Sequence, residues 1–134
     1  MYLLDANVCV RFMNGTSANV ARNFNRCHSK SIVVCSIVRA ELLYGARHSR
    51  QIEKNLLRVK EFLKPLPSLP FDDACAEEYA KIKSELSRKG NLIGPNDLLI
   101  AAIALAHDII LITNDTREFS RVRNLRLEDW QENE

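Results

Sequence analysis

The chain has 134 residues, of which 46% are hydrophobic and 27% charged, and its formal net charge is +2. A chain of this length is expected to form one domain, residues 1–134, whose core needs no disulfides. The sequence has no apolar run of about 18 residues and reaches Asp5 too early for a secretory signal peptide, so we expect a cytoplasmic protein without a membrane span.

The first predicted elements are one strand and two helices. Tyr2–Leu4 is a short apolar run that predicts a buried strand ending at Asp5. The helix that follows is expected to stop at Asn14 and Gly15, which favour a turn. Ser17 has a side chain typical of a helix N-cap and predicts the start of the next helix.

Residues Ser31–Cys35 carry the strongest strand signal of the first half, because they are apolar and largely β-branched. Such a continuous run is typical of a parallel strand that is covered on both faces. Ser36 is predicted as the N-cap of a third helix, and apolar residues at helical spacing predict a fourth over Ile52–Leu63. The three prolines within residues 65–70 cannot donate to a sheet ladder, so a strand there should lie at an edge.

The second half continues the alternation. Asp72 or Asp73 is expected to cap and open a long helix, and a second, apolar helix is expected to start at Asp97. Ile109–Ile112 predicts another strong strand, and Leu125–Leu127 predicts a short last one. Strands that alternate with helices indicate an α/β fold with a parallel sheet and right-handed crossovers.

Four acidic residues lie where a predicted strand gives way to a helix: Asp5, Glu41, Asp97 and Asp115. Asp5 and Asp115 directly follow strands, and Glu41 lies within about 8 Å of a strand end, at roughly 1.5 Å per helical residue. Asp97 opens a helix that returns to the start of the next strand. Because parallel sheets bind ligands at the carboxyl ends of their strands, we expect the four side chains to meet there.

Converging carboxylates repel one another unless a cation lies among them, so the pattern predicts a metal site. An all-oxygen set without a partnered His or Cys favours Mg²⁺, with Mn²⁺ as a substitute. Such an ion lowers the pKa of bound water and neutralises charge on a phosphoryl group. The predicted reaction is therefore hydrolysis of a phosphodiester, with the four acids as catalytic and metal-binding residues.

Several other residues are candidates for supporting roles. Side chains that could orient the acids or their waters, or serve only as turn and cap residues, are Asn7, Thr113 and Asn114. Arginines that flank the predicted site and could contact phosphates are Arg39, Arg47 and Arg117. Glu118 lies near the predicted site and is expected to form a local ion pair with a nearby arginine, with a supporting role at the site as the alternative. The four cysteines lack C-x-x-C spacing and are expected to be free thiols. None of the three histidines, including His28, is expected to bind the metal.

The motifs together resemble those of the PIN-domain ribonucleases, and within them the VapC toxins of type II VapBC toxin–antitoxin systems. The resemblance runs the full length and is carried, in order, by residues 4–7 (LDAN), 41–46 (ELLYGA), 93–97 (IGPND) and 112–119 (ITNDTREF). The closing residues 125–130 (LRLEDW) resemble the subgroup that cuts initiator tRNA.

The resemblance implies a three-layer α/β/α sandwich with a parallel sheet of strand order 3-2-1-4-5. It implies a Mg²⁺- or Mn²⁺-dependent endoribonuclease that cuts RNA, in particular tRNA, and thereby inhibits translation. It also implies a VapB-type antitoxin whose C-terminal segment blocks the site. The toxin is expected to form a homodimer, and a heterotetramer or larger assembly with the antitoxin, which binds operator DNA.

One departure from the family pattern concerns the residue after the first acid. The family usually has Thr or Ser there, whereas this chain has Ala6, so a hydroxyl that could hold a metal-bound water is missing. Some relatives carry Asn in place of Asp115, which implies that Asp115 is the least critical acid. The alternative function is accordingly a weak or inactive PIN domain that binds protein or RNA.

Two other folds of similar topology are disfavoured. A receiver-like phosphoacceptor domain would carry adjacent acids after the first strand and a lysine after a late strand, and neither is present. A dinucleotide-binding domain would need a G-x-G-x-x-G turn, and the four glycines form none.

Overall fold

The computed structural model describes residues 1–27 and 31–132 and contains a five-stranded sheet. The strands are β1 (Tyr2–Leu4), β2 (Ile32–Cys35), β3 (Ser68–Leu69), β4 (Ile110–Ile112) and β5 (Leu127–Glu128). Their order is β3-β2-β1-β4-β5, and every pairing is parallel. Both the parallel sheet and the strand order implied by the family resemblance are therefore confirmed, and the proline-flanked strand lies at an edge.

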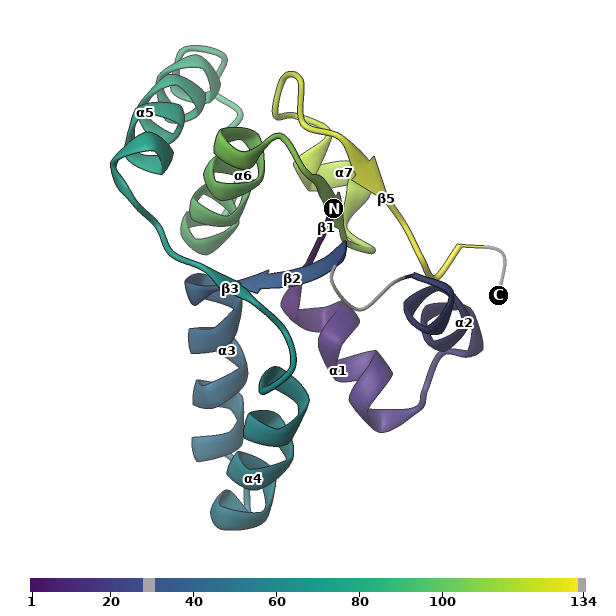
Figure 1. Cartoon of the computed structure of the whole chain (residues 1–134). Helices are drawn as coiled ribbons and strands as arrows, with labels where there is room; N and C mark the ends of the chain where they lie inside the picture. The colour runs from purple at the N-terminus through teal and green to yellow at the C-terminus, as the bar shows by residue number, and fades with distance from the viewer. Residues whose placement is uncertain (28–30, 133–134) are drawn as a thin grey trace.

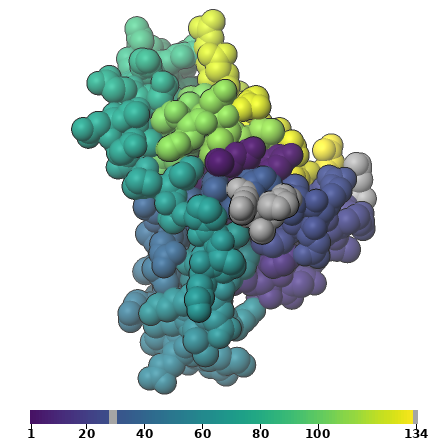
Figure 2. All heavy atoms as spheres, in the orientation of Figure 1, coloured from purple at the N-terminus to yellow at the C-terminus, as the bar shows by residue number. Residues whose placement is uncertain are grey.

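Seven helices flank this sheet in the described part of the chain. They are α1 (Ala6–Asn14), α2 (Ala18–Arg26), α3 (Ser36–Arg47), α4 (Ile52–Leu63), α5 (Asp73–Arg88), α6 (Pro95–His107) and α7 (Thr116–Phe119). In Figure 1, α5 and α6 lie on one side of the strands and α1 and α2 on the other, which gives the expected three layers. Helices α3 and α4 pack as a hairpin that protrudes from the body at the bottom of Figure 2.

The strands are buried because helices cover both faces of the sheet. Leu3, Leu4, Val34 and Leu111 are completely inaccessible to solvent. The sheet register pairs Leu4 with Ile112, so β1 and β4 end side by side. This register fixes which side chains meet at the carboxyl edge.

Side-chain caps set several helix boundaries as predicted. Ser17 accepts a hydrogen bond from the N–H of Val20 at 3.1 Å, and Asp72 accepts one from the N–H of Cys75 at 3.1 Å. The prediction for Ser36 was wrong, because Cys35 is the N-cap residue and Ser36 is the first residue of α3. The Ser36 hydroxyl instead donates to the carbonyl of Leu69 in the neighbouring strand, at 3.4 Å.

Two other boundaries differ from the sequence prediction. Helix α6 starts at Pro95 rather than Asp97, because the fixed backbone angle of proline suits the first helical position. Strand β5 begins at Leu127 rather than Leu125, because Asn124 takes a left-handed turn with φ of 68°. All four cysteines are free, as expected, and none of the described helices is long and apolar enough to cross a bilayer.

Two glycines provide a test of the local backbone. Gly15 ends α1 with φ of 65°, whereas Gly45 lies inside α3, and a methyl group added at either would meet no atom within 4 Å. Gly15→Ala should lower the free energy of unfolding by about 1 kcal/mol, because L-residues are strained in the left-handed region. Gly45→Ala, the matched control, should raise it by roughly 0.5–1 kcal/mol through the higher helix propensity of alanine. Urea denaturation of both variants measures the difference, and a shift of the same sign in both would contradict this account.

Candidate active site

Asp5 occupies the centre of the carboxyl edge, between β1 and α1. Its side chain is only 7% exposed and accepts hydrogen bonds from the N–H of Ala6 at 2.8 Å and from the hydroxyl of Thr113 at 2.9 Å. Its own N–H donates to the carbonyl of Ile112 on the neighbouring strand at 2.9 Å. Asp5 is therefore held rigidly by both of the central strands.

Thr113 links Asp5 to a second acid. This threonine is completely buried directly after β4, and its hydroxyl oxygen also accepts a hydrogen bond from the N–H of Asp115 at 3.0 Å. Asp115 in turn caps α7 by accepting the N–H of Glu118 at 3.3 Å. A single hydroxyl group thus sets the distance between the acids that follow two adjacent strands.

Glu118 belongs to the acidic cluster, whereas the sequence interpretation favoured an ion pair with an arginine over a supporting role at the site. It was expected to pair with an arginine, but its carboxylate accepts the N–H of Gly94 at 2.7 Å and shares a hydrogen bond with Asp97. One oxygen each from Asp97, Asp115 and Glu118 lies within 4.8 Å of the others. The signal that could have revealed Glu118 is its place three residues after Asp115, the spacing of a helix capping box.

Glu41 completes the cluster from α3. One of its carboxylate oxygens, Oε1, is buried and has no hydrogen-bond partner among the described residues. Burial raises the pKa of Glu41 and the charge of Asp5 raises it further, whereas the side chain of Asn96 lowers it. A buried carboxylate oxygen without a donor is costly unless a cation or a proton satisfies it.

The clustered charges act on one another. Burial is the largest cause that raises the pKa of Asp5, and the negative charges of Asp115 and Glu118 add to it. Burial and the hydrogen bond with Glu118 raise the pKa of Asp97 to about 8. The N–H of Gly94 lowers the pKa of Glu118. Near neutral pH, Asp97 therefore carries a proton that it shares with an ionised Glu118.

The chemistry of this cluster fits a hard divalent cation. Asp97, Asp115 and Glu118 each offer one carboxylate oxygen within 4.8 Å of the others, and Glu41 Oε1 has no hydrogen-bond donor among the described residues. A cation would replace the shared proton and remove the repulsion that raises these pKa values. The charges of Asp5, Glu41, Asp97 and Asp115 act on one another, which places these four acids in one region of the structure, and their roles in metal binding and catalysis stay predictions.

A second group of ligand atoms lies elsewhere, where α5 begins and α6 ends. Atoms of Asp72, Cys75 and His107 fall within 4.8 Å of one another. The Asp72 carboxylate already caps α5, and His107 lies in the last turn of α6, where a cation complements the helix dipole. Helix-end electrostatics therefore explains this group. Of the other histidines, His28 lies outside the described residues.

The remaining candidates lie around the rim of the site. Arg117 is exposed on α7 beside Glu118. Arg39 precedes Glu41 by two residues, which places the two side chains on opposite faces of α3, and Arg47 lies about 9 Å further along the axis. Asn7 is exposed in the first turn of α1, and the side chain of Asn114 is half-buried. Their proposed contacts with waters or phosphates stay predictions.

An apolar groove opens beside the acids, between α1 and the α3–α4 hairpin. Its lining includes Val10, Met13, Leu42 and Val59, and Glu41 lies at its edge. Arg58 crosses from α4 to α1 and donates to the carbonyl of Met13 and to the side chain of Asn14, both at 3.2 Å. The hydrogen bonds of Arg58 therefore hold α1 and α4 together across the groove, and the groove includes Glu41, a residue of the predicted site.

Comparison with known proteins identifies this arrangement. The sequence pattern of the PIN domain matches residues 2–125. The tRNA(fMet)-specific endonuclease VapC of Shigella flexneri is 38% identical over 129 residues, which cover 96% of this chain and 97% of that protein. Ribonuclease VapC2 of Rickettsia felis is 39% identical over 131 residues, 97% of this chain and 98% of that protein.

Solved structures agree with these relatives. The crystal structure of VapBC2 from Rickettsia felis bound to a promoter DNA fragment contains a chain that matches with a TM-score of 0.89 and 39% identity, over 96% of this chain and 98% of that chain. DNA-bound VapBC from Salmonella typhimurium matches with a TM-score of 0.89 and 35% identity, over 96% and 97% of the two chains. The chain therefore belongs to the PIN-domain family, and within it to the VapC group.

Proposed function

We propose that this protein is the toxin of a toxin–antitoxin pair and acts as a metal-dependent endoribonuclease. The observation that carries the proposal is a group of acidic side chains at one edge of the sheet: one oxygen each from Asp97, Asp115 and Glu118 lies within 4.8 Å of the others, and the charges of Asp5 and Glu41 are close enough to raise the pKa of Asp97. VapC relatives of nearly the same length, named ribonucleases and tRNA(fMet)-specific endonucleases, support it.

The proposed catalytic and metal-binding residues are Asp5, Glu41, Asp97 and Asp115, and the structure adds Glu118 to this set. Mg²⁺ is the proposed ion, with Mn²⁺ as its substitute, because the donors are all oxygens. When bound, such an ion neutralises charge on the reacting phosphate and lowers the pKa of bound water. Thr113 keeps the Asp5 carboxylate aimed at the site, and the Gly94 N–H does the same for Glu118.

The proposed substrate is tRNA, with initiator tRNA as the first candidate, because two relatives are named for that activity. Cleavage of such an RNA would inhibit translation. Of the three arginines proposed to contact phosphates, Arg117 is next to Glu118 in sequence, Arg39 is two residues from Glu41, and Arg47 is six residues beyond Glu41. The site would act in the bacterial cytoplasm, within a single domain of residues 1–134.

The proposed partner is a VapB-type antitoxin. The apolar groove between α1 and the α3–α4 hairpin suits an amphipathic segment of such a partner, because it is lined by Val10, Met13 and Leu42 and ends at Glu41. A segment in this groove would cover the acids and block RNA. The toxin would form a homodimer, or a heterotetramer or larger complex with the antitoxin, which alone would contact operator DNA.

The competing proposal is a weak or inactive domain that only binds protein or RNA, and Ala6 is the observation that favours it. Asp5→Asn separates the two functions, because asparagine has nearly the shape of aspartate and keeps one oxygen, which can still accept from the Ala6 N–H, but it loses the charge and the second oxygen, which accepts from the Thr113 hydroxyl. For the enzyme, Asp5→Asn should reduce cleavage of initiator tRNA at least about a hundredfold, the scale expected for a group acting at the reacting centre.

The measurement is gel-resolved cleavage by antitoxin-free protein with Mg²⁺, repeated with a chelator. Asp73→Asn is the control, because Asp73 is exposed on α5 away from the cluster. Wild-type protein that cuts no tRNA with Mg²⁺ or Mn²⁺, or Asp5→Asn protein that cuts as fast as wild type, would refute the catalytic assignment.

The acidic cluster also predicts how the metal-free protein responds to pH. The pKa of Asp97 is about 8 in the folded protein and 3.8 ordinarily, so the folded state binds the extra proton between these values. This proton contributes its full stabilisation of the folded state below about pH 4. The contribution falls as pH rises and is lost once pH passes 8. Between pH 6 and 9 the metal-free protein should lose about 1–2 kcal/mol, a figure reduced for the solvent screening of a half-exposed group.

Chemical denaturation in the presence of a chelator measures this loss. Asp97→Asn should show a smaller loss between the same two pH values, and added Mg²⁺ should restore the stability of the wild type at high pH. Because the pKa of Glu118 is lowered, that residue does not titrate in this window. Identical pH profiles for wild type and Asp97→Asn would show that the shared proton is not on this pair.

A further inference from the structure

The acidic site creates a problem for an RNA enzyme, because its carboxylates repel the phosphate backbone that it must hold. Affinity for RNA comes largely from cationic side chains that contact phosphates. These cations must lie near the acids without forming ion pairs that would neutralise both groups. Arginines next to the site that have no carboxylate partner are therefore the side chains best suited to hold the RNA.

Helix α5 brings its basic end close to the site. The start of α5, at Cys75, lies against the end of α6, at His107, so the two helices are antiparallel. The end of α5 must then lie beside the start of α6, which carries Asp97. This basic end includes Arg88 and Lys89.

Arg121 lies directly beside the acidic cluster. Its guanidinium donates to the carbonyl of Leu92 at 3.2 Å, in the connection from α5 to α6. Two residues later in that connection, Gly94 donates to Glu118. The positive charge of Arg121 is close enough to lower the pKa of Glu118, yet the two side chains form no ion pair. Arg121 is therefore a fixed, exposed cation at the edge of the site.

A groove continues from Arg121 along α5. Residues on the groove that carry positive charge are Lys81, Arg88, Lys89, Arg121 and Arg123. The distance from Glu77 to Lys89 along the helix is roughly 18 Å, which is long enough to meet several phosphates of an RNA strand. We call this surface the α5–α7 groove, because it lies between α5 and residues 121–124, which follow α7.

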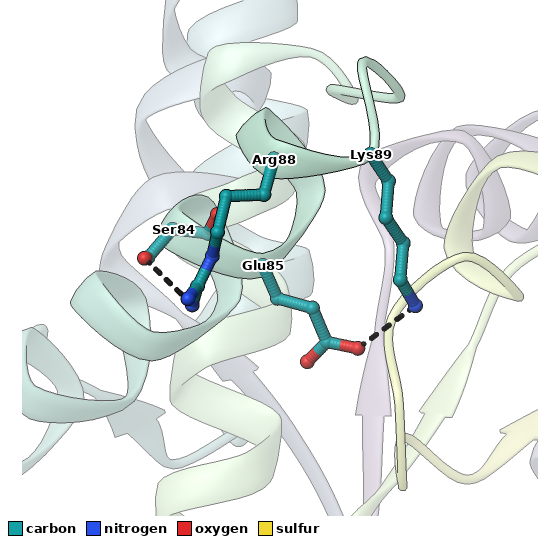
Figure 3. A network of polar contacts seen from close by, with 4 residues as sticks. All are labelled: Ser84, Glu85, Arg88 and Lys89. Carbon is teal, nitrogen blue, oxygen red and sulfur yellow. Dashed lines mark hydrogen bonds and ion pairs between the residues drawn. The ribbon is translucent and has the colours of Figure 1, made fainter.

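The charges in this groove divide into paired lysines and unpaired arginines. Lys89 contacts Glu85 at 3.1 Å and Lys81 contacts Glu78 at 3.8 Å, and such exposed pairs are weak. Arg88 donates instead to the hydroxyl and the carbonyl of Ser84, at 3.0 and 3.3 Å (Figure 3).

Within residues 1–27 and 31–132, no carboxylate forms an ion pair with Arg88, Arg121 or Arg123. The planar guanidinium of arginine matches a phosphate in two-point contacts. The remaining acid, Glu77, lies at the end of the groove farthest from the site. Positive charge that is free to bind phosphate is therefore concentrated toward the site.

We propose that the α5–α7 groove binds the phosphate backbone of the RNA substrate outside the position of cleavage, chiefly through Arg88, Arg121 and Arg123. This proposal rests on the proposed ribonuclease function and names the surface that holds the substrate. The RNA in this groove must extend beyond the acidic site, as a folded RNA does. A short single strand that occupied only the acidic site would not reach Arg88 or Arg123.

Binding measured in the Asp5→Asn background tests the groove without cleavage. The probe is fluorescein-labelled initiator tRNA, and fluorescence anisotropy is recorded over a series of salt concentrations. Arg121→Gln combined with Arg123→Gln should weaken binding about tenfold and flatten the salt dependence by about one logarithmic unit per lost phosphate contact. Arg22→Gln combined with Arg26→Gln, which removes two exposed charges from α2, is the matched control and should have a smaller effect.

A second pair of substitutions guards against damage to the α5–α6 connection. Arg88→Gln with Arg123→Gln leaves the Arg121–Leu92 contact intact and should also weaken tRNA binding and flatten its salt dependence. If both pairs bind tRNA with the affinity and salt dependence of the control, while the wild type cleaves RNA, the groove is refuted and the ribonuclease assignment survives. If the wild type neither binds nor cleaves tRNA, both proposals fail.

Discussion

The mutual repulsion of carboxylates at one edge of the sheet is the constraint on which the rest of this structure depends. Asp5 is nearly inaccessible to solvent, and the negative charges of Asp115 and Glu118 act on it. Burial and repulsion would protonate this side chain, or move it toward solvent, if nothing opposed them. The protein opposes this with a hydrogen bond from its own hydroxyl group, Thr113, and with a helix N-terminus at Ala6. The same solution recurs at Glu118, which is held by the Gly94 N–H at the start of α6. The short parallel strands place these hydrogen-bond donors next to the acids. Burial of the apolar core supplies the free energy that offsets the repulsion between the carboxylates.

The protonation of the acidic cluster connects the stability of the metal-free protein with metal binding. Asp97 and Glu118 share a proton in the absence of metal, and the burial that raises the pKa of Asp97 also brings its oxygen within 4.8 Å of Asp115 and Glu118. A site that held its acids farther apart would keep ordinary pKa values, but it would bind a divalent ion weakly because fewer oxygens could reach it. Glu41 Oε1, which has no hydrogen-bond partner among the described residues, fits the same explanation. A protein donor bound to this oxygen would compete with the cation for it. The close spacing of the acids therefore destabilises the metal-free site, and the same spacing favours the binding of a metal ion.

Sequence reasoning succeeded where a local pattern sets the structure and failed where a distant contact does. The apolar runs around Leu3 and Val33 predicted buried parallel strands, and the acids that follow such strands could be placed at one edge from topology alone. The exact strand order and the three layers came from family resemblance, because periodicity carries no information on which strands are neighbours. Ser36 was misassigned because its hydroxyl has a partner 33 residues away, in β3, that competes with capping. An ion pair was favoured for Glu118 for a related reason: the group that holds it in the cluster, the Gly94 N–H, lies 24 residues earlier, at the start of α6.

The two grooves beside the acids separate tasks that one surface could not perform. The groove between α1 and the α3–α4 hairpin is lined mainly by apolar side chains and includes Glu41, whereas the α5–α7 groove carries five cationic side chains, of which Arg121 lies close to Glu118. An apolar segment loses little by leaving water, but a phosphate backbone must keep its charge solvated or paired, so the two ligands favour opposite surfaces. Figure 1 places α1 and the α3–α4 hairpin on the far side of the strands from α5. On the proposed functions, an antitoxin segment would therefore inhibit by covering the acids at Glu41 while the arginines stay exposed. Inhibition would then require no competition for the cationic surface, and the affinity of the inhibitor would depend far less on salt than the affinity of the RNA.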